Sequence, residues 1–297
     1  MDAPISAAPL PLKAVIYATD FSPFAQKAGG YASLLAKQFG VDLMAAHAFV
    51  LSNAAMEVEA EDGRRTKSAQ RVDLETALAA EANRFGAGAK GTVPVLLEGD
   101  PRERIPRLAE ENAPSLIVLG THGRGRMVRG IVGSVADRIL RSTNGPTLTV
   151  GPEVPAYPAD CSPFRRILYA TGLSPAAARG AIYAVAMAQA FDASLDVLHV
   201  VRPDDVADQA RFREIQTQFH ATIEEMVPQR ANAILNPRGQ VEVGSAHERI
   251  LEYLRKNQVD LLVLSIRKSS HLWLQSRVSG AFHIIATAPC PVLTMTG

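Results

Sequence analysis

The stretch Tyr17-Ala-Thr-Asp-Phe-Ser-Pro23 recurs 152 residues later as Tyr169-Ala-Thr-Gly-Leu-Ser-Pro175. At the same separation, Tyr31 matches Tyr183, Phe39 matches Phe191 and His47 matches His199. After a shift of seven residues, Gly99 matches Gly244, and Glu103-Arg-Ile105 matches Glu248-Arg-Ile250. Identities at a fixed offset indicate an internal duplication. We therefore predict two tandem domains, residues 1–152 and 163–297, joined by a proline-rich linker.

Each copy alternates short apolar runs with longer helical patterns, which is typical of βαβ units around a parallel sheet. In the first copy we expect strands near 14–19, 43–48, 93–97, 115–119 and 147–150, and helices near 23–39, 64–86, 102–112 and 134–142. In the second copy we expect strands near 166–170, 194–199, 239–243, 260–265 and 292–295. Ser22 before Pro23 should open the first helix, and Gly40 should close it. The predicted fold class is α/β, with two tandem open, doubly wound, five-stranded and mainly parallel sheets.

The composition limits the classes of partner. A net charge of +1 gives no reason to expect nucleic acid or a membrane surface as a ligand. No apolar run approaches the roughly 18 residues that span a bilayer, and the first residues lack the pattern of a signal peptide. The two cysteines, Cys161 and Cys290, fit neither a metal knuckle nor a disulfide framework, which suggests a reducing compartment. We expect a cytoplasmic protein.

The segment that follows the fourth predicted strand is rich in glycine. Gly120, Gly123, Gly133 and Ser134 fill the spacing G-x2-G-x9-G-S, and a helix is expected to begin at Ser134. Ligands of open α/β sheets bind outside the carboxyl ends of the strands, where helix amino termini offer N–H groups to anions. Glycines let the backbone approach phosphate oxygens and allow positive φ. Three arginines, Arg124, Arg126 and Arg129, add positive charge to this loop or form a solvated basic loop.

Two commoner nucleotide motifs do not fit. A P-loop requires a lysine after its second glycine, and no suitable glycine here is followed by one. A dinucleotide fingerprint requires glycines directly after the first strand, which instead ends in Ala18-Thr-Asp20. The motif is therefore a different phosphate loop.

The first copy has the segment Tyr17 to Pro23 before this glycine spacing and the segment Gly145-Pro-Thr-Leu-Thr-Val150 after it. With these features the chain resembles the universal stress protein family over nearly its whole length. The resemblance implies an adenine nucleotide alpha-hydrolase-like, Rossmann-like fold that binds ATP, with Mg²⁺ joining through the phosphates. It implies that Ala18, Thr19 and Asp20 line the adenosine, with Asp20 near the ribose and near any Mg²⁺, and that Ala48 borders the adenine. It further implies that Leu119 and Gly120 approach ribose and base, and that His122, Gly123, Gly133, Ser134 and Val135 meet the phosphates.

The second copy departs from this pattern. Ser265, Lys268, Val278 and Ser279 stand where the first copy has Gly120, Gly123, Gly133 and Ser134, and Gly172 replaces Asp20. Side chains now occupy the points of close approach, and positive φ at Val278 would be strained. We predict that the second domain does not bind ATP in the family manner. Arg267 and Lys268 leave open a different anionic ligand.

Two functions from different classes remain. One is a nucleotide-binding stress or signalling module whose ATP occupancy is recognised by a protein partner. The other is a slow ATPase or nucleotide-dependent transferase, although no nucleophile elbow, metal-binding helix or general base is found in the motifs. His47 and His199 recur in both copies, which favours a structural role, and Cys290 is expected to be a small buried hydrophobe.

The resemblance also implies that the last strand of each copy mediates assembly, because related single-domain proteins usually dimerise through their last strands. Thr147-Leu-Thr-Val150 and Val292-Leu-Thr-Met295 are the candidate edges, and pairing them would hide two exposed strand edges at once. The second domain would then act as an intramolecular pseudo-dimer partner of the first. A homodimer of the whole chain is an open alternative.

Overall fold

The computed structural model describes residues 10–50, 60–123, 130–157, 164–173, 177–226, 237–266 and 280–296. The first half contains β1 (Ala14–Ala18), α1 (Pro23–Phe39), β2 (Asp42–Phe49), α2 (Ala60–Phe85), β3 (Thr92–Glu98), α3 (Pro101–Glu111), β4 (Ser115–Gly120), α4 (Ser134–Ser142) and β5 (Thr147–Val150). The second half contains β6 (Arg166–Ala170), α5 (Ala177–Phe191), β7 (Ser194–Val201), α6 (Pro203–Ala207), α7 (Gln209–Met226), β8 (Arg238–Val243), α9 (Ala246–Lys256), β9 (Leu261–Ile266), α11 (Gly280–Thr287) and β10 (Val292–Thr296).

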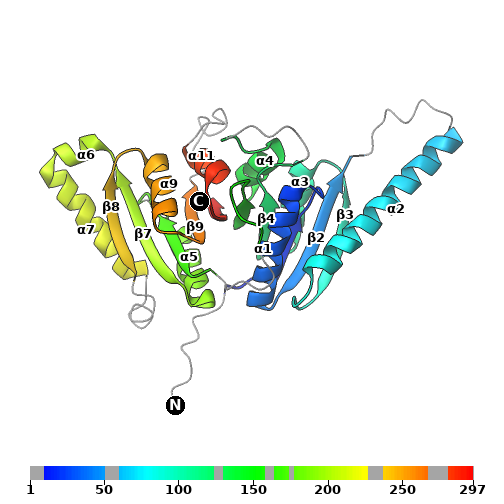
Figure 1. Ribbon diagram of the computed structural model, residues 1–297, viewed down its shortest axis with the longest axis horizontal. Coiled ribbons are helices and arrows are strands. Elements are labelled where there is room, and N and C mark those ends of the chain that lie inside the picture. Colours follow the sequence, from blue (N-terminus) through cyan, green and yellow to red (C-terminus); the bar gives the residue numbers. More distant parts are fainter. Residues whose placement is uncertain are drawn as a thin grey trace, which may run out of the picture.

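The strands form one ten-stranded sheet in the order β3-β2-β1-β4-β5-β10-β9-β6-β7-β8. Within each half every pairing is parallel, and the order in the second half repeats the order in the first. Figure 1 shows the two halves side by side, with α4 and α11 near the middle. The predicted α/β class with two open, mainly parallel sheets is confirmed, and the two sheets are continuous with each other.

The predicted pairing of the two last strands is also confirmed. β5 and β10 run antiparallel, with Leu148 opposite Leu293, and both side chains are buried. The Thr149 hydroxyl donates to the Val292 carbonyl at 3.2 Å, and the Thr294 hydroxyl reaches across the same pair of strands. Each strand would otherwise expose a row of unpaired backbone groups, so the pairing satisfies both edges at once.

Aromatic side chains reinforce the junction on one face of the sheet. The ring centroids of Phe39 and Phe191, on α1 and α5, lie 6.3 Å apart in an edge-on arrangement. Phe164 packs between the halves, with its ring 5.0 Å from Phe191 and 6.2 Å from Tyr31. The Lys27 ammonium donates to two carbonyls of the linker, those of residues 152 and 154. The two halves therefore share a core as well as a strand pair.

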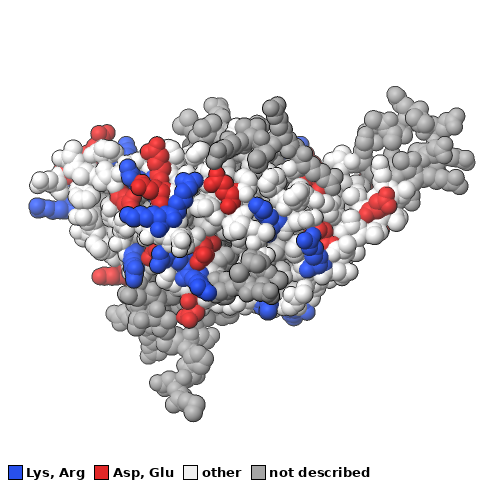
Figure 2. Space-filling model, in the orientation of Figure 1, with Lys and Arg blue, Asp and Glu red and all other residues white. Residues whose placement is uncertain are grey.

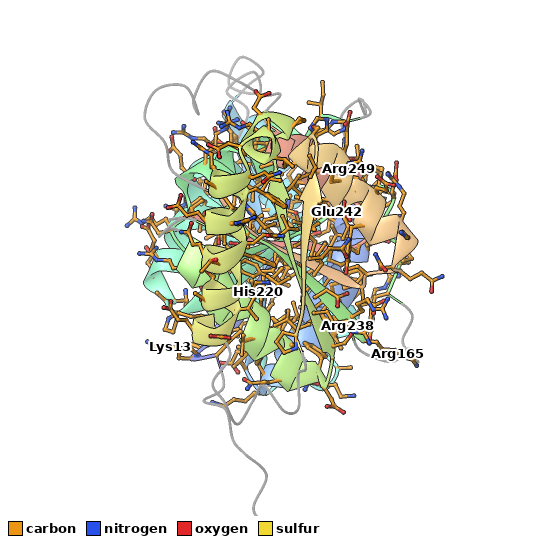
Figure 3. All side chains as sticks on the ribbon, turned by 90° about the vertical axis from the view of Figure 1, so that its left-hand side faces the viewer. Lys13, Arg165, His220, Arg238, Glu242 and Arg249 are labelled. Carbon is orange, nitrogen blue, oxygen red and sulfur yellow. The ribbon has the colours of Figure 1, made fainter. Side chains whose placement is uncertain are left out.

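The outer edges of the sheet are protected against further pairing. Edge strand β3 carries an exposed proline, Pro94, which lacks a backbone donor. Edge strand β8 carries Arg238 and Glu242, which Figure 3 shows along the outer side of the second half. Charge and proline on edge strands disfavour edge-to-edge association.

The helix ends follow the sequence signals. The Ser22 hydroxyl accepts from the Ala25 N–H at 3.2 Å, and Gly40 ends α1 in the left-handed region at φ 62°. α2 begins at Ala60, earlier than the predicted 64. Among the described residues, no helix is both long and apolar enough to cross a membrane. Acidic and basic side chains are intermixed on the face seen in Figure 2.

Replacing Leu148 with alanine should lower the free energy of unfolding by about 2–5 kcal/mol, because the side chain is fully buried at the junction. Leu293→Ala should have a similar cost. Since the two residues face each other, the double variant should differ from the sum of the singles by at least about 0.5 kcal/mol in urea unfolding. Val72→Ala, at an exposed position, is the control and should change stability by less than about 0.5 kcal/mol. Strict additivity would contradict the predicted energetic coupling between the two side chains.

Candidate functional site

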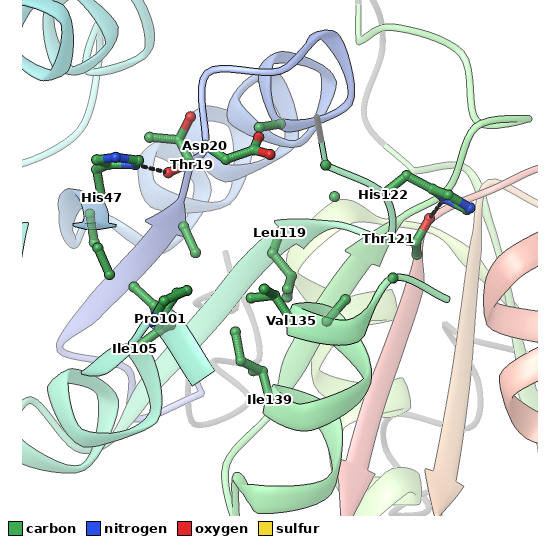
Figure 4. Close-up of a pocket in the computed structure, with 18 of the residues that line it drawn as sticks. Thr19, Asp20, His47, Pro101, Ile105, Leu119, Thr121, His122, Val135 and Ile139 are labelled. Carbon is green, nitrogen blue, oxygen red and sulfur yellow. Dashed lines mark hydrogen bonds between the residues drawn. The ribbon is translucent and has the colours of Figure 1, made fainter. Parts of the chain in front are cut away.

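A cavity of about 390 Å³ lies at the carboxyl ends of β1, β2 and β4 (Figure 4). Its volume falls within the range of small-molecule sites. All the residues that sequence reasoning assigned to a nucleotide lie in its wall: Ala18, Thr19, Asp20, Ala48, Leu119, Gly120, His122, Gly123, Gly133, Ser134 and Val135. The topology therefore brings three separate segments, after strands one, two and four, to one place.

Eight further residues line the cavity and escaped sequence reasoning as site residues: Ala25, Ala46, His47, Pro101, Ile105, Thr121, Ala136 and Ile139. Pro101 and Ile105 come from the first two turns of α3, which begins after the Asp100 N-cap. A helix that follows strand three starts at the same carboxyl edge of the sheet. That placement is the signal that could have found them.

The apolar part of the wall consists of small and branched side chains. Ala46, Leu119 and Ile139 are buried, and Ile105 closes the same side. Small residues at the ends of β1 and β2 leave room that larger side chains would fill. Such a surface suits a flat heterocycle, which gains from burial of its faces.

The turn between β1 and α1 is tightly held. The Thr19 N–H donates to the Ala46 carbonyl at 2.9 Å, and His47 Nδ1 lies 2.7 Å from the Thr19 carbonyl oxygen. A carbonyl can only accept, so this ring nitrogen donates. The Phe21 N–H donates to Thr19 Oγ1 at 3.0 Å, and Phe21 adopts a positive φ of 62°. These contacts fix the residue between them, Asp20.

The recurrent histidines have the structural role that the repeat predicted. His199 Nδ1 lies 2.8 Å from the Thr171 carbonyl oxygen, as His47 does from that of Thr19. Both tie the end of the second strand to the turn after the first. His47 also borders the cavity, so in the first domain it lies within the site.

The amino terminus of α4 faces the cavity. Its N-cap is Gly133, which has no side chain to bond the first turn and whose own N–H donates to the Thr121 carbonyl at 2.8 Å. Ser134 and Val135, in the first turn, line the cavity. The first N–H groups of a helix lack acceptors within it, and the macrodipole is positive there. An anion is the natural acceptor for these groups.

A cation balances the acidic residue in this first turn. Asp137 pairs with Arg141, one turn on, at 3.0 Å, and the guanidinium carbon lies 4.5 Å from the ring centroid of Phe282 on α11. The helix is thereby fastened to the second domain. Arg124, Arg126 and Arg129 lie outside the described residues.

The glycines are required for a reason other than the one predicted. None of Gly120, Gly123 and Gly133 has a φ in the left-handed region, and Gly133 has φ −60°. A Cβ at Gly120 would lie 3.1 Å from the Phe24 carbonyl group, and one at Gly133 would lie 3.0 Å from the Thr121 oxygen. The expectation of positive φ at these three glycines is wrong. Close approach of backbone to backbone is the requirement.

Asp20 and Gly123 are also in close contact. Asp20 Oδ1 accepts from the Ser22 N–H at 3.0 Å, and a Cβ at Gly123 would lie 2.5 Å from Asp20 Oδ2. The carboxylate therefore rests against the loop after β4. Glycine at position 123 keeps it there.

His122 is part of the cavity wall. Its Nδ1 bonds the Thr121 hydroxyl at 2.9 Å, its ring packs 5.7 Å from that of Phe24, and the residue is buried. In Figure 4 the imidazole lies beside Thr121 and points away from Thr19, Asp20 and His47.

The cavity offers one carboxylate to a metal ion. Among the described residues, no group of three or more histidine, cysteine or acidic side chains could hold a metal ion. Mg²⁺ that is bound mainly through nucleotide phosphates needs only one or two protein carboxylates. Asp20 fits that limited role, because one of its oxygens faces the glycine loop.

The corresponding region of the second domain keeps the turn but changes the loop. The Leu173 N–H donates to Thr171 Oγ1 at 3.2 Å, and Leu173 has φ 50°, which repeats the first domain. Gly172 replaces Asp20 and so removes the carboxylate. The Ser265 hydroxyl packs against Gly180, where an added Cβ would lie only 2.2 Å from it. The other substituted positions, Arg267, Lys268, Val278 and Ser279, lie outside the described residues.

Cys290 is a buried side chain, as the sequence predicts. It is 3% exposed, and burial raises the pKa of its thiol well above the usual range. A thiol that stays protonated is a poor nucleophile. Cys161 lies outside the described residues.

Comparison with known proteins identifies the family. The profile of the universal stress protein family matches residues 11–151 and 163–295. The crystal structure of a universal stress protein from Archaeoglobus fulgidus DSM 4304 is similar over 97% of this chain and 99% of that chain, with a TM-score of 0.69 and 20% sequence identity. This likeness establishes the fold.

Two shorter similarities add to the comparison. Universal stress protein MJ0577 from Methanocaldococcus jannaschii is 30% identical over 56 residues, so the chain matches 19% of its own length and 35% of that protein. A universal stress protein solved in complex with cAMP matches 46% of this chain and 98% of its own, at 18% identity and a TM-score of 0.33.

The two segments that the family profile matches span most of the sequence and coincide with the two repeated halves of the sheet. The chain belongs to the universal stress protein family, as a tandem two-domain member.

Proposed function

We propose that this protein binds ATP in its first domain only and acts as a nucleotide-binding stress-response or signalling module. The observation that carries the proposal is the single cavity lined by residues from the β1 turn, the end of β2 and the glycine loop after β4. Each of these segments supplies the chemistry that one part of ATP requires.

The apolar wall is assigned to the adenine. Ala46, Ala48, Ile105 and Leu119 would enclose the base, which loses water-exposed surface on binding. Asp20, at the rim of the turn, is assigned to the ribose. A carboxylate accepts hydrogen bonds from sugar hydroxyls, as in other nucleotide sites.

The phosphates are assigned to the glycine loop and the start of α4. Uncapped N–H groups at Ser134 and Val135 and the helix dipole would stabilise negative charge. Bare backbone at Gly123 and Gly133 keeps side chains out of this region. Mg²⁺ would neutralise phosphate charge, with Asp20 as its protein ligand.

One nucleotide per chain is proposed, because the second domain lacks the necessary groups. Gly172 offers no carboxylate, and the Ser265 side chain lies at the point where Gly120 presents bare backbone. The second domain would serve instead as a permanent partner that holds α4 through Phe282. Arg267 and Lys268 keep a different anionic ligand open.

The biological setting is also part of the proposal. A cytoplasmic location agrees with two cysteines that form no disulfide framework in the sequence. A protein partner that recognises ATP occupancy, and a homodimer of the whole chain, stay predictions. The competing function is a slow ATPase or transferase. A binding module would retain intact ATP through purification, whereas an enzyme would yield ADP or AMP over several turnovers.

Calorimetric titration of the full chain with Mg-ATP should give a stoichiometry of one. Gly123→Val should weaken binding at least about 10-fold, the equivalent of about 1.4 kcal/mol, because its side chain would displace the Asp20 carboxylate. Thermal unfolding should change little, since the displaced atom is the end of a mobile side chain. cAMP, run in parallel, competes for the same base wall but lacks a polyphosphate.

The matched control is Gly172→Val in the second domain, where no atom lies within 4 Å of a new Cβ. It should leave ATP affinity unchanged. A stoichiometry of two, or equal losses from both glycine variants, would contradict binding in the first domain alone. Tighter binding of cAMP than of ATP would contradict the assignment of the loop to a polyphosphate.

Asp20→Asn should preferentially reduce the Mg²⁺-dependent part of the affinity. Asparagine can still accept from the Ser22 N–H, so the turn is preserved, while the ligand charge for a metal is lost. We expect ATP affinity in Mg²⁺ to fall about 5-fold or more, and affinity in EDTA to change less, as measured by calorimetry in the two buffers. An equal loss in both buffers would assign Asp20 to the ribose alone.

A further inference from the structure

A buried carboxylate lies behind the turn that carries Asp20. Glu81, on α2, is 7% exposed, and the Tyr17 hydroxyl donates to its Oε2 at 2.7 Å. Tyr17 itself is fully buried on β1. The two residues are 64 positions apart in sequence, and neither lines the cavity.

A chain of hydrogen bonds connects this pair to the turn. Tyr17 Oη and Thr19 Oγ1 lie 3.2 Å apart, and Thr19 Oγ1 accepts from the Phe21 N–H at 3.0 Å. A carboxylate only accepts, so the single Tyr17 proton points to Glu81, and the Thr19 hydroxyl proton is free to point to Tyr17. Glu81 thereby sets the direction in which the Tyr17 hydroxyl donates.

Two features indicate that this series of hydrogen bonds, from Glu81 to the Phe21 N–H, needs a fixed end. Phe21 is a non-glycine residue at φ 62°, a conformation that costs free energy and persists only where surrounding contacts hold it. Burial, and then the nearby Glu81, raise the pKa of the Tyr17 phenol above its usual range, so it remains a donor. The Tyr17 hydroxyl therefore stays available to donate to Glu81.

In the second domain, the tyrosine at the equivalent position has a different hydrogen-bond partner. Tyr169, the counterpart of Tyr17, has hydrogen bonds to Thr171 and to Ser265. Ser265 occupies the position of Gly120, and Gly180 makes room for its hydroxyl where the first domain has Ala28. A domain that presents bare backbone at position 120 cannot supply this hydroxyl. Glu81 provides the missing partner from another helix.

We propose that Glu81 is a positioning residue for nucleotide binding: through Tyr17 and Thr19 it holds the Asp20 turn in its binding conformation. The inference rests on the proposed binding of ATP in the first domain. The helix α2 contributes no residue to the cavity wall. The proposal nevertheless gives this helix a role in the affinity for ATP.

The test compares Glu81→Leu with Glu81→Gln in the full chain. Leucine leaves the Tyr17 hydroxyl without its acceptor, whereas glutamine can still accept through Oε1. We expect Glu81→Leu to raise the Kd for Mg-ATP about 10-fold, on the order of one lost buried hydrogen bond, and Glu81→Gln to stay within about 2-fold. Hydrogen exchange at the Phe21 amide should accelerate in the leucine variant only.

Two control variants on α2 separate positioning from stability and charge. Leu78→Ala removes a buried contact of the same helix and should lower thermal stability without changing ATP affinity of the folded protein. Glu75→Leu removes an exposed carboxylate, paired with Arg71, and should change neither property appreciably.

The outcomes are distinguishable. Wild-type affinity in Glu81→Leu, or an equal loss in Leu78→Ala, would overturn the proposal. A wild-type chain that does not bind ATP would instead refute the proposed function. In that case exchange at Phe21 still decides whether Glu81 holds the turn, since unchanged exchange in Glu81→Leu would overturn that role independently.

Discussion

The antiparallel pairing of β5 with β10 is the contact on which the arrangement of the whole molecule depends. Each domain alone would end in an exposed strand, and joining the two strands satisfies both backbones while burying Leu148 against Leu293. The pairing also brings α1 against α5 on one face and α4 against α11 on the other, where Arg141 meets Phe282. A tandem chain thus carries its own partner, at a fixed ratio of one to one.

Because of this arrangement, the second domain can accept substitutions at its carboxyl edge without loss of the shared sheet. Its contribution to the shared sheet requires only backbone pairing and apolar faces, which β9 and β10 retain. The end of β9 can therefore change its side chains without loss of the shared sheet. The substitution at Ser265 illustrates this freedom, because its hydroxyl serves Tyr169 within the core and Gly180 accommodates it.

The first domain is constrained by close approach at the carboxyl edge. The end of β4 lies so near the start of α1 that a Cβ on Gly120 would be only 3.1 Å from the Phe24 carbonyl group, and a Cβ on Gly123 would lie 2.5 Å from Asp20 Oδ2. The same closeness that excludes side chains exposes main-chain donors and the amino terminus of α4 to a ligand. Packing therefore favours glycine at the positions where the proposed anion binding would also favour it, and the backbone requires no left-handed conformation there.

The sequence by itself determined the duplication, the α/β class and the wall residues that motif spacing could mark, because βαβ topology sends the ends of β1, β2 and β4 to one edge. The resemblance to the family predicted that the two last strands would pair, which also hides two costly unpaired edges. Only the tertiary structure placed Pro101 and Ile105 in the cavity, bonded the His122 ring to Thr121 and showed that Gly133, at φ −60°, lies close to the Thr121 carbonyl oxygen. The contact between Glu81 and Tyr17 was likewise visible only in the tertiary structure. It spans 64 residues and depends on how α2 packs against the sheet, which local sequence periodicity cannot predict.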